Sequence, residues 1–146
     1  DIRQFDHLMD TQLTLALILS VWTCDSAAFV LGTLFGKKKI FPAVSPKKSW
    51  VGSISGLIAA TSVMVLFSIQ GWLGDYFSLN DALVFGLIAG VFGQLGDFTE
   101  SLLKRDAGVK DSGTLLAGHG GVLDRFDSLI FAMPLSYLYI HFLMHI

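Results

Sequence analysis

The sequence has little charge for its length. Charged residues make up 15% of the 146 positions, against about 25% in an ordinary soluble domain. Residues 51–69, VGSISGLIAATSVMVLFSI, contain no charged residue at all, and this run approaches the ~20 residues that a membrane-spanning helix needs. The shortage of charge therefore excludes an ordinary soluble domain and indicates a protein of the lipid bilayer.

Cysteine is nearly absent, and so is one common phosphate-binding motif. Cys24 is the only cysteine, so no disulfide can form within the chain, and its apolar surroundings favour a packing role. No GxxxxGK[ST] segment occurs, which excludes a nucleotide-binding loop of that type. The net charge is −2, and we expect no nucleic acid among the partners.

Three further apolar stretches resemble residues 51–69. They are residues 13–31, interrupted by Asp25; residues 82–96, which run on into a charged extension; and residues 128–146, which contain Pro134. We therefore predict an all-α fold, a polytopic bundle of about four transmembrane helices. Residues 1–146 would form a single domain. The first ten residues resemble neither a signal peptide nor the start of a chain, so we expect an N-terminal part of the protein to be missing.

Basic residues are concentrated in two connections. Nine of the ten Lys and Arg residues lie within residues 37–50 or 104–125, and only Arg3 lies elsewhere. By the positive-inside rule both connections are cytoplasmic, whereas the N-terminus, residues 70–81 and the C-terminus face outward. We expect an inner or plasma membrane of the bacterial type.

Small residues predict that the first helix packs closely against another helix. A helix over residues 11–35 would carry Ala28, Gly32 and Gly36 at a four-residue spacing, which lets another helix approach closely. A second helix would begin near Trp50. The small-residue faces also suggest a homodimer.

Two aspartates lie in or beside apolar stretches. An aspartate at the centre of a membrane helix costs roughly 2.5–3.5 kcal/mol, so Asp25 should face a polar cavity or a partner. Asp97 would share a helix face with Ser101 and Lys104. That face is either part of a site or a solvated helix end with a salt bridge between Glu100 and Lys104.

The segment GHGGVLDRFD, residues 118–127, precedes the last apolar stretch. A helix beginning near Gly121 would present free backbone amides and a positive dipole end to phosphate oxygens. Asp124, however, would repel an anion unless a cation lay between them. Carboxylates beside Lys and Arg are what Mg²⁺-dependent phosphoryl or nucleotidyl transfer needs. We therefore predict a metal site in which Asp97 lies opposite Asp124.

The segment SLLKRDAGVKDSGTLLAGHGGVLDRFD resembles the signature of the phosphatidate cytidylyltransferases, also called CDP-diacylglycerol synthases. The segments QLGDFTES from Gln94 and SPKKSWVG from Ser45 resemble the same family, and DSAAF from Asp25 does so weakly. The family usually has an acidic residue where Val51 stands, and its members have further preceding helices. The chain thus resembles the C-terminal catalytic part. Eleven residues match the main signature with its spacing: Ser101, Lys104, Arg105, Lys110, Asp111, His119, Gly120, Gly121, Asp124, Arg125 and Asp127.

The resemblance implies synthesis of CDP-diacylglycerol and pyrophosphate from CTP and phosphatidate, in a polar cavity that faces the cytoplasm. It implies Mg²⁺ as cofactor, and a second cation, divalent or monovalent, could join it. The implied metal ligands are Asp97, Asp124 and Asp25. The implied catalytic residues are Lys104, Arg105, Lys110, Asp111, His119, Arg125 and Asp127. The implied substrate-binding residues are Ser45, Lys47, Lys48, Ser101, Gly120 and Gly121.

Two other functions fit part of the sequence. A CTP-dependent polyprenol or dolichol kinase would also join CTP to a lipid, but it would phosphorylate an alcohol and release CDP. An ion-coupled transporter would bind a cation near mid-membrane through Asp25 and Asp97. The transporter hypothesis gives no role to the basic residues and the His-Gly-Gly segment. The kinase and the cytidylyltransferase can be distinguished by analysing their products.

Overall fold

The computed structural model describes residues 2–75, 77–109 and 123–142; the side chains of residues 2–10 and 123–125 lie outside this description. The described part is helical, apart from turns and an isolated β-bridge between Lys39 and Ser49. Its elements are α1 (Ile2–Phe35), α2 (Trp50–Ile69), α3 (Leu79–Leu87), the π-helical turn η1 (Ile88–Phe92), α4 (Gly93–Asp106) and α5 (Leu123–Phe142).

Three helices among the described residues are long and apolar enough to cross a membrane. They are Thr11–Phe35, Trp50–Ile69 and Leu79–Asp106, the last of which joins α3, η1 and α4. The prediction of an all-α membrane protein is thus confirmed for three of the four helices. The fourth, α5, begins with a turn that contains Asp124 and Asp127, and its crossing of the membrane stays a prediction.

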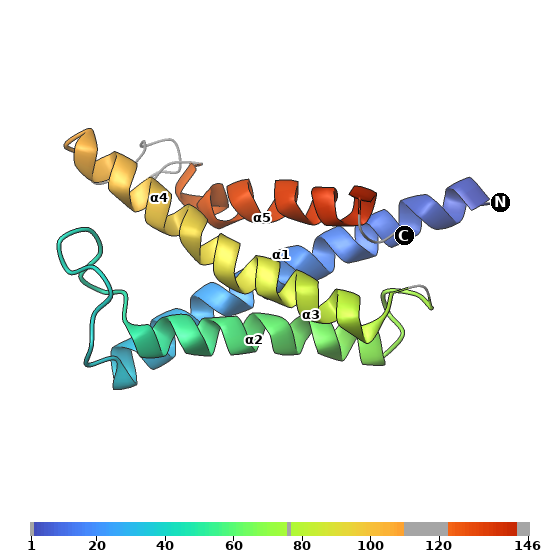
Figure 1. The fold of residues 1–146 in the computed structure, drawn as a ribbon, viewed down its shortest axis with the longest axis horizontal. Coiled ribbons are helices and arrows are strands. Elements are labelled where there is room, and N and C mark those ends of the chain that lie inside the picture. Colours follow the sequence, from blue (N-terminus) through green and yellow to red (C-terminus); the bar gives the residue numbers. More distant parts are fainter. Residues whose placement is uncertain (1, 76, 110–122, 143–146) are drawn as a thin grey trace.

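The helices run roughly along the long axis of the molecule (Figure 1). α2 packs against both α1 and α3, and α5 packs against α4. Residues 36–49 and the C-terminal end of α4 lie at one end of the bundle, together with the start of α5 (Figure 1). We call this the basic end, because Lys37–Lys39, Lys47, Lys48, Lys104 and Arg105 lie there. The turn after α2 lies at the opposite end of the molecule, the end at which α1 begins (Figure 1).

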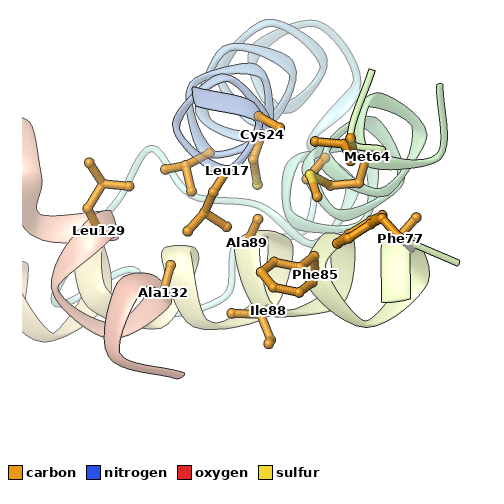
Figure 2. Packing of buried hydrophobic residues seen from close by; sticks show 14 residues of the cluster. Leu17, Cys24, Met64, Phe77, Phe85, Ile88, Ala89, Leu129 and Ala132 are labelled. Carbon is orange, nitrogen blue, oxygen red and sulfur yellow. The ribbon is translucent and has the colours of Figure 1, made fainter. Parts of the chain in front are cut away.

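The core contains side chains from α1, α2, α3, η1 and α5, and from the turn between α2 and α3 (Figure 2). Phe85 is fully buried, and its ring centroid lies 5.4 Å from that of Phe77 and 5.6 Å from that of Tyr139. Cys24 is 1% exposed within this core, which confirms its predicted packing role. The buried residues labelled in the figure are Leu17, Cys24, Met64, Phe77, Phe85, Ile88, Ala89, Leu129 and Ala132.

Glycines bring α1 and α2 into backbone contact. A Cβ on Gly52 would lie 2.5 Å from the carbonyl oxygen of Ala28 and 3.1 Å from the Cα of Gly32. The Ser49 hydroxyl accepts a hydrogen bond from the Gly52 amide at 3.2 Å and so caps α2. The predicted close packing is confirmed. Gly32 and Gly36 face Ser49 within the chain, and the homodimer stays a prediction.

Candidate active site at the basic end

Gly96 lets α4 and α5 approach closely at the basic end. A Cβ on Gly96 would overlap the carbonyl oxygen of Asp127 and lie 3.2 Å from the Cα of Ser128. A larger residue would therefore force the two backbones apart. Because Asp97 follows Gly96 directly, its side chain is brought close to the first turns of α5.

Three carboxylates converge at this contact. One carboxylate oxygen each from Asp97, Glu100 and Asp127 lies within 4.8 Å of the others. Glu100 is buried, and the other two are half-buried. We call these three residues the acidic cluster. Like charges at this separation repel one another strongly in a medium of low dielectric constant, so the cluster needs cations nearby.

Two lysines neutralise part of this charge. The Lys48 Nζ lies 2.6 Å from Asp97 Oδ2, and the Lys104 Nζ lies 3.3 Å from Glu100 Oε2. The Lys48 ammonium also lies over the ring of Phe98, 4.1 Å from its centroid. The predicted ion pair between Glu100 and Lys104 is confirmed, although Glu100 is buried and not solvated. These two ion pairs involve Asp97 and Glu100. The negative charge of Asp127, the third carboxylate of the acidic cluster, makes this region suited to bind a further cation.

Ser128 links the acidic cluster to Asp25 of α1. Its hydroxyl donates a hydrogen bond to Asp25 Oδ2 at 3.4 Å, and its backbone amide donates one to Asp127 Oδ1 at 2.6 Å. Asp25 therefore has the polar partner that its position within an apolar helix requires. It lies beside the acidic cluster, and its role as a metal ligand stays a prediction.

Two cavities lie at the basic end, and Asp97 of the acidic cluster lines the first of them. The first has a volume of about 190 Å³ and extends between α1, α2 and α4; Asp25, Phe29, Lys48, Gln94 and Asp97 are among the residues that line it. The second has a volume of about 350 Å³ and lies between residues 44–47 and the end of α4. Its polar lining consists of Ser45, Lys47, Ser101, Lys104 and Arg105. Ser45 and Lys47 line both cavities, so the connection between α1 and α2 separates two neighbouring spaces.

Contacts with α4 hold that connection in place. The ring of Phe41 packs edge-on against Phe98, with 5.8 Å between centroids. The Arg105 Nε donates a hydrogen bond to the Val44 carbonyl at 3.5 Å. Together with the Lys48–Asp97 ion pair, these contacts place residues 41–48 over α4.

The structure brings many of the predicted site residues together. Those with described side chains line the two cavities or join the acidic cluster: Asp25, Ser45, Lys47, Lys48, Asp97, Ser101, Lys104, Arg105 and Asp127. Asp124 and Arg125 lie in the first turn of α5, and their side chains are outside the description. Lys110, Asp111, His119, Gly120 and Gly121 lie outside the described residues.

Sequence reasoning missed two residues of this region. Glu100 was interpreted only as the partner of Lys104, although its position three residues after Asp97 puts both on one helix face. Gln94 was read only as part of a resemblance, although an amide within an apolar stretch needs hydrogen-bond partners. Both residues lie in α4, which therefore contributes more residues to the site than the sequence predicted.

The chain is similar to proteins of one family. It matches the cytidylyltransferase family over residues 6–143. It is 42% identical to phosphatidate cytidylyltransferase of Bacillus subtilis over 138 residues, which cover 94% of this chain and 50% of that protein. It is 45% identical to the enzyme of the same name from Haemophilus influenzae over 131 residues, covering 87% of this chain and 45% of that one. The chain spans about half the length of these relatives.

Proposed function

The chain belongs to the cytidylyltransferase family, and from this membership we propose that it transfers the cytidylyl group of CTP to phosphatidate, forming CDP-diacylglycerol and pyrophosphate. Such a reaction would serve phospholipid biosynthesis. The observation that carries the proposal is the acidic cluster at the basic end of a membrane helix bundle. Its member Asp97 lines the first cavity, and Lys104, the ion-pair partner of Glu100, lines the second.

The acidic cluster is suited to Mg²⁺. Mg²⁺ prefers hard oxygen ligands and is usually held by one or two carboxylates together with substrate phosphates. Asp97, Glu100 and Asp127 offer such oxygens within 4.8 Å of one another, and Asp124 and Asp25 would assist them. A bound Mg²⁺ would draw together phosphate oxygens and offset their charge. A second cation, divalent or monovalent, would be held by the same group of carboxylates.

The second cavity would hold the triphosphate of CTP. Its cationic side chains, Lys47, Lys104 and Arg105, can balance the charge of phosphate oxygens, and Ser45 and Ser101 can donate hydrogen bonds to them. Lys110, Asp111, His119, Gly120, Gly121 and Arg125 would complete this site from outside the described residues. The water-soluble substrate would thus bind at the end of α4, beyond the apolar part of the bundle.

The first cavity would hold the phosphate of phosphatidate. It reaches Ala28 and Phe29 of α1, which lie within one of the apolar helices able to cross a membrane. The acyl chains can therefore stay in the bilayer while the phosphate enters beside Lys47 and Lys48. Because Ser45 and Lys47 line both cavities, the two substrates would meet there.

The reaction needs positioning more than proton transfer. A phosphate oxygen of phosphatidate would attack the α-phosphorus of CTP, forming a new P–O bond, while the bond from that phosphorus to the β-phosphate oxygen breaks. The nucleophile is already an anion, so no strong general base is needed. Lys104 and Arg105 would offset the negative charge that develops on the departing pyrophosphate.

The membrane placement follows the distribution of charge. The basic end, with the polar cavities, would face the cytoplasm of a bacterial-type inner membrane. α5 would be the fourth membrane-spanning helix and would place the C-terminus outside. A homodimer would use helix faces other than the Gly32 face, which α2 covers.

The reaction is tested by product analysis. Purified protein given Mg²⁺, labelled CTP and phosphatidate should release pyrophosphate and a CDP-lipid, and omission of either substrate should abolish release. Asp97→Asn should lower the rate strongly and leave the helix content unchanged. Formation of CDP with a phosphorylated alcohol would instead identify a lipid kinase and reject the proposal.

A further inference from the structure

Gln94 joins three helical segments through one amide group. Its Nε2 donates hydrogen bonds to the Gly90 carbonyl at 2.7 Å and to the Ser53 carbonyl of α2 at 3.0 Å. The same nitrogen lies 3.6 Å from the Cys24 Sγ of α1. Gln94 is half-buried and lines the first cavity, next to the acidic cluster.

The π-helical turn η1 lies immediately before Gln94 and includes Gly90. A π-helical turn adds one residue to a helix and is often found at functional sites. Since each residue of an α-helix turns through about 100°, the added residue rotates every later side chain relative to those of α3. The Gln94 amide donates a hydrogen bond to a carbonyl within this turn.

The contacts of the glycines follow this change of face. Before the end of η1, the helix packs on α2: a Cβ on Gly86 would lie 2.5 Å from the Thr61 Cα, and one on Gly90 would lie 2.9 Å from the Leu57 Cα. After it, Gly96 packs on the backbone of α5 at Asp127 and Ser128. One continuous helix thus changes its main packing partner across η1, from α2 before it to α5 after it.

We propose that Gln94 is a positioning residue: by fixing η1 against α1 and α2, it sets the rotation of α4 that turns Asp97 and Glu100 toward Asp127. An amide suits this task because it donates two hydrogen bonds without adding charge beside the acidic cluster. Lipid offers no replacement for these bonds, so an apolar side chain would leave two carbonyls without this donor. The catalytic consequence rests on the proposed function, whereas the rotation of α4 does not.

The rotation can be tested without any assay of activity. In a protein with Asp97→Cys and Asp127→Cys, oxidation should join the two thiols, because the carboxylate oxygens of these residues lie within 4.8 Å of each other. Cys24 is 1% exposed and should stay unreactive. Adding Gln94→Met should slow disulfide formation several-fold, measured as loss of maleimide-reactive thiols. The matched control is Gln70→Met, an exposed glutamine at the end of α2, which should leave the rate unchanged.

Equal oxidation rates with and without Gln94→Met would overturn the proposal, as would a cysteine pair that fails to oxidise with Gln94 in place. In the protein with its native carboxylates, Gln94→Met should lower kcat roughly 10- to 100-fold and raise the Mg²⁺ concentration needed for half-maximal rate. The KM values for CTP and phosphatidate should hardly change. A raised KM for phosphatidate at unchanged kcat would mean that Gln94 contacts the lipid and would also overturn the proposal. If native protein releases no pyrophosphate, the proposed function fails, and the oxidation rates still decide the role of Gln94.

Discussion

Glu100 places a carboxylate in the interior of the bundle, with 5% of its surface exposed. A buried charge is costly unless other charges and hydrogen bonds compensate it. Lys104 supplies one positive charge, 3.3 Å from Glu100 Oε2. Asp97 and Asp127 add two negative charges within 4.8 Å, and Lys48 pairs with only the first of these. Among the side chains that the structure describes, the local excess of negative charge fits a binding site for a cation.

Replacing Glu100 should therefore weaken metal binding. Glu100→Gln keeps the size of the side chain but removes its charge, so the Mg²⁺ concentration for half-maximal activity should rise at least roughly tenfold, as it does when a partner of a metal ligand is lost. A Mg²⁺ titration of pyrophosphate release measures this. Asp106→Asn is the control, because Asp106 is an exposed acid at the end of the same helix. An unchanged Mg²⁺ requirement in Glu100→Gln would remove Glu100 from the metal site.

The ion pair of Glu100 with Lys104 could be predicted from their spacing, because residues four apart on a helix are neighbours. The burial of Glu100 could not, since it depends on the contact between α4 and α5 at Gly96. The sequence resemblance assigned Lys48 to substrate binding, and its ion pair with Asp97 depends on how residues 41–48 fold back over α4. The burial of Glu100 and the ion pair of Lys48 therefore depend on contacts between segments that are distant in the sequence, which local sequence patterns do not predict.

Helix packing near the basic end depends on glycines on both partners. Gly52 meets the backbone of Ala28 and Gly32, and Gly56 would place a Cβ 2.8 Å from the Cys24 carbonyl. The spacing of small residues predicted this face of α1 correctly. The π-helical turn η1 was not predicted, because residues 82–96 have the sequence pattern of an ordinary apolar helix. Only the packing of this helix, first on α2 and then on α5, distinguishes it from a regular α-helix.

A single methyl group should disturb the contact between α1 and α2. In Gly52→Ala the new Cβ would lie 2.5 Å from the Ala28 carbonyl oxygen, so the helices must separate, at a cost of about 1–3 kcal/mol. The unfolding midpoint in an SDS titration, followed by circular dichroism, measures the loss. Ser62→Ala, on the exposed side of the same helix, should change stability by less than about 0.5 kcal/mol. Equal midpoints for the two variants would contradict the close contact.

The bundle as a whole has its basic connections at one end of its long axis. The basic connection between α1 and α2 and the basic end of α4 lie together, while the turn after α2 lies at the other end (Figure 1). Alternating crossings of apolar helices predicted this grouping, because each helix must reverse the direction of the one before. The two cavities could not be predicted in the same way, since they form where residues 41–48 dock on α4.

The orientation of the bundle in the membrane can be measured with thiol reagents. Cys24, the only native cysteine, is 1% exposed and should not react, so a cysteine introduced at an exposed position reports its own side of the membrane. In intact cells, Asp75→Cys, in the turn after α2, should react with an impermeant maleimide, and Lys38→Cys, in the basic connection, should react only after the membrane is opened. Both positions are exposed, so a difference between them reflects the membrane and not local burial. The reverse pattern would place the acidic cluster on the outer side, away from cytoplasmic CTP, and would contradict the proposed reaction as well as the orientation.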